Sequence, residues 1–347
     1  MAGDSDHIVA DTAARIFADV ADPQTINRAK DSGWKAPLWS ALEEAGLTLA
    51  WVPEHLGGSG ASLGEGFAVL GAAGRYAVSL PLAETMLAGW LLARAGIGSP
   101  AGTMSIAPVR PHERVQIEGG RLRGQAVVPF ASDTQHIALL AETTVALVAT
   151  GSCRIGEGRN LAGEPAPLVD FSGAEALQSG TSSTDTEQFM LIGAAVRAMQ
   201  TAGALQTILS MSVAYANERV AFERPIGKFQ AVQQNLARLA GEAAAALAAA
   251  GSAADALADR SASQDAVFLE VASAKIRCAE AAAEGSAIAH QVFGAIGFTQ
   301  EHVLHRFTLR MLGWRDDFGN ESWWAAELGR RVARRGADEF WPLVASR

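Results

Sequence analysis

The stretch Glu218-Arg-Val-Ala-Phe-Glu-Arg-Pro-Ile-Gly-Lys-Phe-Gln230 interrupts a long run of helical sequence. Pro225 and Gly227 impose a turn, so one helix ends before this segment and another begins after it. The segment also holds two phenylalanines and three cations, Arg219, Arg224 and Lys228. An arginine fork pairs bidentately with phosphate oxygens, so a cation beside an aromatic ring at a helix corner suits a nucleotide diphosphate. A capped helix corner with solvated charges explains the same residues.

On both sides of this turn, apolar residues recur at steps of three and four, which is the period of amphipathic helices. The four stripes are Ala198, Ala202, Leu205 and Leu209; Val232, Leu236, Leu239 and Ala243; Leu269, Ala272, Ile276, Ala279 and Ala283; and Leu304, Phe307, Met311, Trp314 and Phe318. Four such helices with short connections predict a four-helix bundle over residues 185–347. Small residues dominate most of the stripes, so we expect the helices to approach one another closely.

The rest of the chain divides into two regions. Residues 1–98 have helical patterns, notably over 63–73 and 83–95, and a glycine-rich loop at 51–60. Between 99 and 184 the pattern changes to short strands, and Gly119-Gly120 is a hairpin turn between two of them. The predicted fold class is mostly α with a small β domain: an N-terminal helical domain (1–98), a small, mostly antiparallel β domain (99–184) and a helical bundle domain (185–347).

The composition excludes several classes of protein. The 347 residues include 28 Lys plus Arg against 37 Asp plus Glu, and a net charge of −9 is wrong for a protein that mainly binds nucleic acid. The two cysteines, Cys153 and Cys278, are far apart, and His302 and His305 have no evident third ligand, so we expect neither disulfides nor a metal site. The apolar runs are shorter than the roughly 20 residues of a membrane span, and no signal sequence is evident, so we expect a cytoplasmic protein without a membrane partner.

A second segment, Gln291-Val-Phe-Gly-Ala-Ile-Gly-Phe-Thr-Gln-Glu-His302, follows the third stripe. Glycines three apart after a long helix let the backbone approach a planar ligand, and the Gln291 amide can hydrogen-bond an amide-like edge. A C-capping turn between two helices explains the pattern equally well.

Together the two segments resemble the acyl-CoA dehydrogenase family. Its members carry a pattern close to Arg-x-x-Phe-Gly-x-x-Ile-x-x-x-Gln before one bundle helix, and Gln-x-x-Gly-Gly-x-Gly-Phe/Tyr before the last. The N-terminal third is similar as well, because Pro53-Glu-His-Leu-Gly-Gly-Ser-Gly60 and Gly74-Arg75 match the family's usual run. The resemblance covers nearly the whole chain and agrees with the helix–β–helix order of the three regions.

The resemblance implies FAD, which in this family lies where one subunit's β domain meets the neighbouring subunit's bundle. The resemblance assigns eight residues to the adenosine side of a flavin that is held mainly by another chain. They are Arg219 at the pyrophosphate, Phe222, Ile226, Phe229 and Gln230, and at the adenine end Gln291, Gly294 and Ala295. Two residues depart from the pattern. Glu223 stands where glycine is usual, and Ala295 replaces the second glycine.

The catalytic base that the resemblance requires is missing. The family's reaction removes an α-proton from an acyl thioester, and a carboxylate in an apolar site is suited to this role because burial raises its pKa. Counting from Gln291 without gaps places Phe318 at the usual base position. The alternative position, on the first bundle helix, is Gly193. Glu321 can serve as a base only if that alignment shifts by three residues.

The family's Thr-Glu-Pro-x-x-Gly-Ser-Asp stretch, which holds the flavin ring, is also missing from residues 99–184. Relatives with this profile are the short, β-type subunits of heteromeric α2β2 acyl-CoA dehydrogenases, notably of bacterial steroid side-chain degradation. The resemblance therefore implies a subunit that completes the FAD site of a full-length partner, which also binds most of the acyl-CoA. A homomeric enzyme using Glu321, and a flavin-free scaffold or acyl-CoA-binding protein, are the alternatives.

Overall fold

The computed structural model describes residues 3–29 and 32–345. It begins with helices α1 (Gly3–Val20), α2 (Pro23–Arg28), α3 (Lys35–Glu44), α4 (Leu63–Arg75) and α5 (Leu82–Arg94), with a short 3-10 helix η1 (Glu54–Leu56) in the glycine-rich loop. A capping box starts α4, in which the Ser62 hydroxyl and the Glu65 carboxylate each accept a hydrogen bond from the other's backbone N–H. These helices surround a buried core that is continuous with that of the bundle.

Two four-stranded sheets follow. Their strands are β1 (Met104–Ala107), β2 (Arg114–Glu118), β3 (Arg121–Val127), β4 (His136–Ala141), β5 (Thr144–Ala149), β6 (Arg154–Ile155), β7 (Leu168–Asp170) and β8 (Gln178–Thr181), with 3-10 turns η2 (Ala131–Asp133) and η3 (Thr150–Ser152). The sheet orders are β1-β4-β5-β8 and β2-β3-β7-β6, and of the named strand pairs β1–β4 alone is parallel. The predicted hairpin is confirmed, since Gly119 and Gly120 connect β2 to β3 with φ of 57° and 81°.

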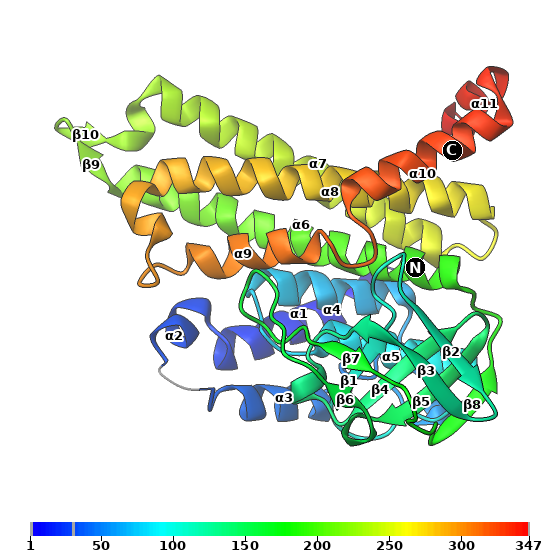
Figure 1. The fold of residues 1–347 in the computed structure, drawn as a ribbon. Helices are drawn as coiled ribbons and strands as arrows, with labels where there is room; N and C mark the ends of the chain where they lie inside the picture. The colour runs from blue at the N-terminus through cyan, green and yellow to red at the C-terminus, as the bar shows by residue number, and fades with distance from the viewer. Residues whose placement is uncertain (1–2, 30–31, 346–347) are drawn as a thin grey trace.

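The bundle contains α6 (Thr186–Glu218), α7 (Gln230–Ala258), α8 (Gln264–Phe293), α9 (Leu304–Trp314), α10 (Glu321–Arg335) and α11 (Phe340–Ala345). Between α6 and α7 lie the hairpin β9 (Val220–Ala221) and β10 (Arg224–Pro225) and the 3-10 turn η4 (Ile226–Lys228). Two more 3-10 turns are η5 (Gly294–Phe298) and η6 (Ala337–Glu339). In Figure 1 the long helices α6, α7 and α8 lie side by side, and α10 projects from the body toward α11.

The prediction of a fourth long helix through Phe318 was wrong. The helix α9 ends at Trp314, and the chain then turns, because Phe318 and Gly319 both have positive φ, 55° and 88°. The side of the bundle opposite α7 is therefore built from two shorter helices, α9 and α10. This break places Phe318 in a loop between them.

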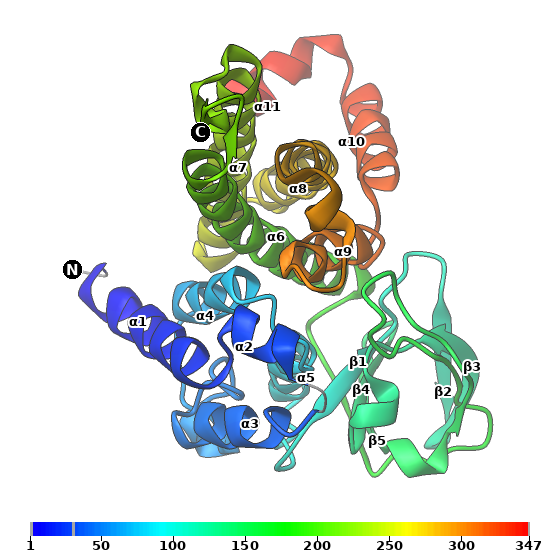
Figure 2. The ribbon, with the colours of Figure 1, turned by 90° about the vertical axis from the view of Figure 1, so that its left-hand side faces the viewer.

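The N-terminal helices meet the bundle where α4 packs against α6. Glycines allow this close approach. A Cβ on Gly203 would lie 2.2 Å from the carbonyl oxygen of Gly71, and a Cβ on Gly74 would lie 2.2 Å from that of Gln200. Figure 2 shows the resulting arrangement, with the N-terminal helices and the sheets both below the bundle. The predicted fold class, mostly helical with small sheets, is confirmed. No helix in the described residues has the length and apolar character to span a membrane.

Candidate functional site

The two segments singled out in the sequence meet in one hollow of about 300 Å³ at the hairpin end of the bundle. Its lining residues are Ala221, Phe222, Ile226, Phe229, Ala231, Val232, Asn235, Gln291 and Val292. Thus four of the eight residues assigned to the flavin lie together: Phe222, Ile226, Phe229 and Gln291. The other four, Arg219, Gln230, Gly294 and Ala295, do not line this hollow. Its lining residues come from the β9–β10 hairpin, the start of α7 and the end of α8. The hairpin and the end of α8 are at the left of the bundle in Figure 1.

The hairpin displays an aromatic side chain at its tip. Phe222 and Glu223 form the turn with φ of 53° and 67°, and the Phe222 side chain is 89% exposed. Its ring meets that of Phe229 edge to face at 6.2 Å between centroids, and the Arg224 guanidinium lies 4.2 Å from the centre of the Phe229 ring. Glycine adopts the conformation of Glu223 at lower cost, which explains why glycine is usual at this position. The glutamate keeps the turn and is itself exposed.

Five of the eight assigned residues lie at or next to the ends of helices. Arg219 is the C-cap of α6, and its side chain is exposed with no carboxylate paired to it within the described chain. Gln291, near the end of α8, accepts a hydrogen bond of 3.2 Å from the Asn235 amide on α7. Gly294 ends α8 with φ of 64°, and Ala295 is exposed in η5. Gln230 is the exposed first residue of α7.

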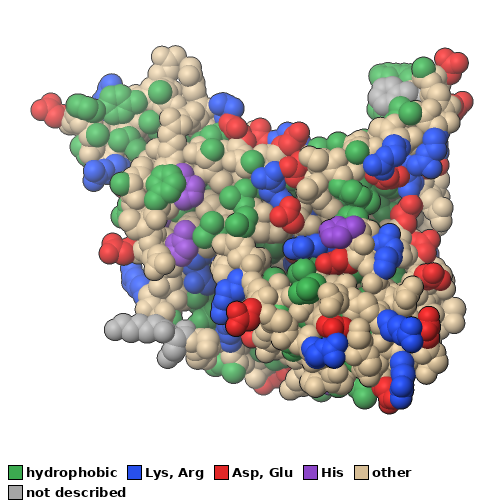
Figure 3. Space-filling model, viewed as in Figure 1, with side chains coloured by type: hydrophobic (Ala, Val, Ile, Leu, Met, Phe, Trp, Pro, Cys, Tyr) green, Lys and Arg blue, Asp and Glu red, His purple; other side chains and the backbone are tan. Residues whose placement is uncertain are grey.

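These residues fit the adenosine half of a dinucleotide. An open apolar hollow with aromatic walls suits a purine ring, the Gln291 amide suits the polar edge of the purine, and an unpaired arginine nearby suits a phosphate. Figure 3 shows the surface dipping between the hairpin end and the α10–α11 end of the molecule.

The two positions at which the resemblance places a base lie against each other. The Phe318 side chain is completely buried, and a Cβ built on Gly193 would lie 2.2 Å from its ring. Phe189, one turn before Gly193 on α6, packs edge to face on the same ring at 5.8 Å between centroids. Neither position carries a carboxylate, and the Phe318 ring occupies the space beside Gly193.

Hydrogen bonds fix this loop in place. The backbone N–H of Phe318 donates to the carbonyl of Val109 at 2.6 Å, and the indole N–H of Trp324 donates to the carbonyl of Phe318 at 2.9 Å. The first bond joins the bundle loop directly to the segment after β1. At this point the loop and the β domain are therefore in direct contact.

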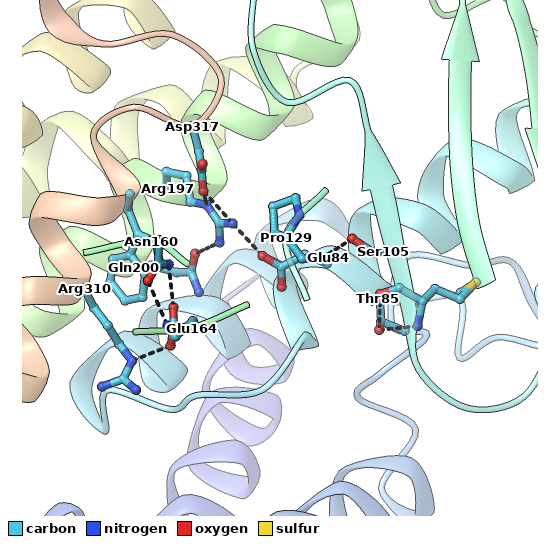
Figure 4. A network of polar contacts seen from close by, with 12 residues as sticks. Glu84, Thr85, Ser105, Pro129, Asn160, Glu164, Arg197, Gln200, Arg310 and Asp317 are labelled. Atoms are coloured by element: carbon cyan, nitrogen blue, oxygen red, sulfur yellow. Dashed lines mark hydrogen bonds and ion pairs between the residues drawn. The ribbon is translucent and has the colours of Figure 1, made fainter. Parts of the chain in front are cut away.

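A buried network of charges adjoins the same loop (Figure 4). Arg197, one turn after Gly193 on α6, pairs with Glu84 of α5 at 2.5 Å and with Asp317 at 2.9 Å, and donates to the Gln200 amide oxygen at 2.7 Å. Burial raises the pKa of Glu84 more than Arg197 lowers it. Burial alone would lower the pKa of Arg197, but the charges of Glu84 and Asp317 outweigh it and raise that pKa.

Lys275 of α8 adds a second buried cation. Its amine donates to the carbonyls of Trp314 and Asp317, each at 2.8 Å. Loss of hydration lowers the pKa of Lys275 to about 7, although Asp317 opposes this shift. The sequence analysis missed this network. The signal was charged residues, Glu84, Arg197 and Lys275, within otherwise apolar helical stretches.

Glu321, the alternative base, is the first residue of α10 and forms an ion pair with Arg315. Burial raises its pKa, but the hydrogen bonds and charge of Arg315 outweigh burial, and the net pKa is lowered. A carboxylate held ionised by an arginine is a weak proton acceptor. His302 and His305 belong to no group of three potential metal ligands within the described residues.

Comparison with protein families matches residues 4–98 to the acyl-CoA dehydrogenase N-terminal domain and residues 184–321 to the acyl-CoA dehydrogenase C-terminal domain. The chain belongs to the acyl-CoA dehydrogenase family. Acyl-CoA dehydrogenase IpdE2 of Mycobacterium tuberculosis is 27% identical over 343 residues, covering 95% of this chain and 96% of that protein. Acyl-CoA dehydrogenase FadE27 of the same organism is 29% identical, covering 86% and 89%.

Solved structures share the acyl-CoA dehydrogenase fold. A chain of the ChsE4-ChsE5 complex from Mycobacterium tuberculosis superposes with a TM-score of 0.85 at 24% identity, covering 97% of this chain and 99% of that one. A chain of the Tcur3481-Tcur3483 steroid ACAD gives a TM-score of 0.85 at 22% identity, covering 96% and 99%.

Proposed function

We propose that this chain is the β-type subunit of a heteromeric, FAD-dependent acyl-CoA dehydrogenase with an α2β2 composition. In the proposed enzyme, a full-length partner supplies the base, the flavin-ring site and most of the acyl-CoA site. This chain supplies the hollow lined by Phe222, Phe229 and Gln291, which we call the adenosine-side hollow. Bound FAD would accept the hydride in the α,β-desaturation of the thioester. We further propose a steroid side-chain CoA ester as substrate and the cytoplasm as location.

The observation that carries the proposal is the contact between Phe318 and Gly193. A carboxylate at either position needs room for a side chain and a cavity into which the acyl α-carbon can come. Here an aromatic ring fills the space beside Gly193, and neither residue can accept a proton. This chain therefore lacks the group that removes the α-proton.

The charge network supports the same conclusion. An acyl chain needs an apolar channel beside the base. Instead, the ion pairs of Arg197 with Glu84 and Asp317 occupy the interior next to Gly193 and Phe318. Opening a channel there would separate buried ion pairs, which costs several kcal/mol. We therefore assign the acyl site to the partner.

The adenosine-side hollow supports the proposal that this chain completes the FAD site of a partner subunit. Phe222 is exposed on the projecting hairpin, where a second chain can reach it. Arg219 has no carboxylate partner among the described residues. Two structures of the same fold are complexes of two differently named chains, ChsE4-ChsE5 and Tcur3481-Tcur3483, and the latter is described as a steroid ACAD.

The test is to co-express this chain with a full-length paralogue that carries the glutamate, and to measure flavin per complex and thioester desaturation. We expect FAD and activity in the complex and neither in this chain alone. Flavin binding and turnover by the chain alone would instead establish a homomeric enzyme. In that case, loss of turnover in Glu321→Gln would identify Glu321 as the base. A complex without flavin would establish a scaffold.

A further inference from the structure

The connection from α8 to α9 holds three histidines, His290, His302 and His305. We call residues 290–305 the histidine turn. It contains the end of α8, the 3-10 turn η5 and the start of α9, and all three residues assigned to the adenine end of the flavin lie in it. In Figure 1 it is the orange turn at the left of the bundle, above α2.

The start of α9 holds His302 in its neutral form. The Nδ1 atom of His302 accepts a hydrogen bond of 3.2 Å from the backbone N–H of Leu304, the first residue of α9. A backbone N–H can only donate, so Nδ1 carries a lone pair and the proton of the ring is on Nε2. A second proton would go to Nδ1 and break this bond. It would also place a positive charge at the N-terminus of a helix, where the helix dipole disfavours it.

His290 is held neutral at the other end of the turn. Its Nε2 lies 3.1 Å from the hydroxyl of Thr308, and this hydroxyl donates to the carbonyl of Leu304 at 3.4 Å. The hydroxyl therefore accepts from the Nε2–H, and Nδ1 carries the lone pair. Nδ1 is buried with no hydrogen-bond partner among the described residues, and a Cβ built on Gly297 would lie 3.3 Å from it. A proton added there would be a buried N–H without an acceptor, which is costly.

Stacking joins the two histidine rings to the two ends of η5. His302 packs on Phe293, the last residue of α8, and His290 packs on Phe298, the last residue of η5, each with 4.4 Å between ring centroids. The backbone between these phenylalanines is η5, and its first two residues are assigned to the adenine end. A shift of either histidine ring therefore moves the backbone of the adenine end.

A third histidine and one carboxylate adjoin these rings. His305 of α9 donates from Nδ1 to the carbonyl of His302 at 2.7 Å, so it can take a second proton on Nε2 without losing this bond. Glu301, the residue before His302, is exposed, and within the described residues its carboxylate forms no ion pair with a histidine.

The other packed elements contribute neutral groups and one cation. Tyr215 of α6 packs on Phe293 with 4.5 Å between ring centroids. Asn27 of α2 donates to the two backbone carbonyls before His302, at 3.0 and 3.1 Å. Arg306 of α9 follows His305 in the sequence and adds positive charge. The surroundings therefore offer an added proton little stabilisation.

The titration of the two histidines has the same sign. Burial is the main cause that lowers the pKa of His290 and of His302, and the charge of His305 lowers both further. An opened turn frees the rings toward their ordinary pKa of about 6.5, so it binds more protons than the ordered turn as pH falls below that value. Acidification therefore favours the opened turn.

We propose that the histidine turn is a pH switch, in which protonation of His302 and His290 opens the turn and displaces the adenine end. Opening of the turn does not depend on the flavin. Its consequence for FAD rests on the proposed function: the complex should hold FAD more weakly at about pH 5.5 than at about pH 8.

The first test is amide hydrogen exchange of the full chain, alone or in the co-expressed complex, at about pH 5.5 and pH 8. Each rate is divided by that of an unstructured peptide at the same pH. We expect the protection of residues 294–304 to fall at least about tenfold at the lower pH, while that of β4 and β5 is unchanged. Unchanged protection of residues 294–304 would overturn the proposal.

Hydrogen-bonding substitutes that do not titrate test the two histidines. His302→Asn keeps an oxygen that accepts from the Leu304 N–H, and His290→Gln keeps a donor to Thr308. The double variant should stay protected at both pH values. His112→Gln removes an exposed histidine of the β domain and should respond to pH like wild type. Loss of protection in the double variant, or no response in His112→Gln, would overturn the proposal.

The second test is release of FAD from the co-expressed complex, followed by flavin fluorescence during acidification. Wild type should release flavin as pH falls from about 7 to 5.5, and the double variant should retain it. Equal retention by both would overturn the coupling to FAD. A complex without flavin at about pH 8 would overturn the proposed function instead, and hydrogen exchange alone then decides whether the turn is a pH switch.

Discussion

The Phe318 ring lies in the space that a side chain on Gly193 would need, since a Cβ there would come within 2.2 Å of Cδ1 of the ring. The two positions that the family offers for a base are thus coupled, and a change at one depends on the residue at the other.

Gly193→Ala should therefore destabilise the chain by about 1–3 kcal/mol through overpacking. Adding Phe318→Ala to Gly193→Ala should cost less than the sum of the two single substitutions, because removing the ring makes room for the methyl group. Urea unfolding of the three variants and wild type measures this coupling. Additive effects would show that the two residues do not share the space.

Phe318→Glu should not restore catalysis in the isolated chain. It would bury a carboxylate where the Phe318 ring now packs against Phe189, and destabilise the fold by several kcal/mol. Phe318→Leu, which keeps the site apolar, should cost about 1–2 kcal/mol. Thermal unfolding ranks the two variants, and a desaturation assay with Phe318→Glu that gave turnover would contradict our assignment.

Arg197→Met should destabilise the chain by about 3–5 kcal/mol, because it leaves the buried Glu84 and the partly buried Asp317 without their cation. Adding Glu84→Leu should recover part of this loss, since the double substitution removes a charge together with its partner. Urea unfolding at neutral pH measures both. If the double variant is as unstable as Arg197→Met, the loss does not come from unpaired charge.

Lys275 should make stability depend on pH above neutrality. Its pKa is about 7 in the folded chain against 10.5 for the unperturbed side chain, so between these values the unfolded chain binds more protons. The Lys275 contribution is therefore least favourable below pH 7, and stability should rise as pH increases from about 7 toward 10.5. Lys275→Met should flatten this rise, and the difference in slope between the two proteins, measured by urea unfolding at several pH values, tests it.

Arg219→Ala should reduce FAD retained by the co-expressed complex without affecting the fold, because the exposed Arg219 side chain forms no ion pair in residues 3–29 and 32–345. Flavin absorbance per complex is the measurement, with Arg123→Ala as control. Unchanged flavin content would remove Arg219 from the proposed site.

Local patterns predicted much of this fold. The Pro225–Gly227 corner, the Gly119-Gly120 hairpin and the first three bundle stripes depend on neighbouring residues, and each was found where the sequence placed it. The stripe from Leu304 to Phe318 failed, because Phe318 is buried by a turn rather than by helical continuation, and apolar spacing does not distinguish the two. The domain boundaries at 98/99 and 184/185 stay predictions.

The candidate site was only partly predictable. Phe222, Ile226, Phe229 and Gln291 meet as expected from two separate motifs. The Glu84–Arg197 pair was missed, since its members are 113 positions apart and single charges in apolar helices do not identify their partners. Whether the eight assigned residues bind FAD stays a prediction.

The bond from the Phe318 N–H to the Val109 carbonyl has a mechanical consequence. It joins the loop between α9 and α10 to the segment after β1, so a displacement of the sheets relative to the bundle pulls on the loop that holds the Phe318 ring. The position of that ring beside Gly193 is therefore set by the β domain as well as by the helices.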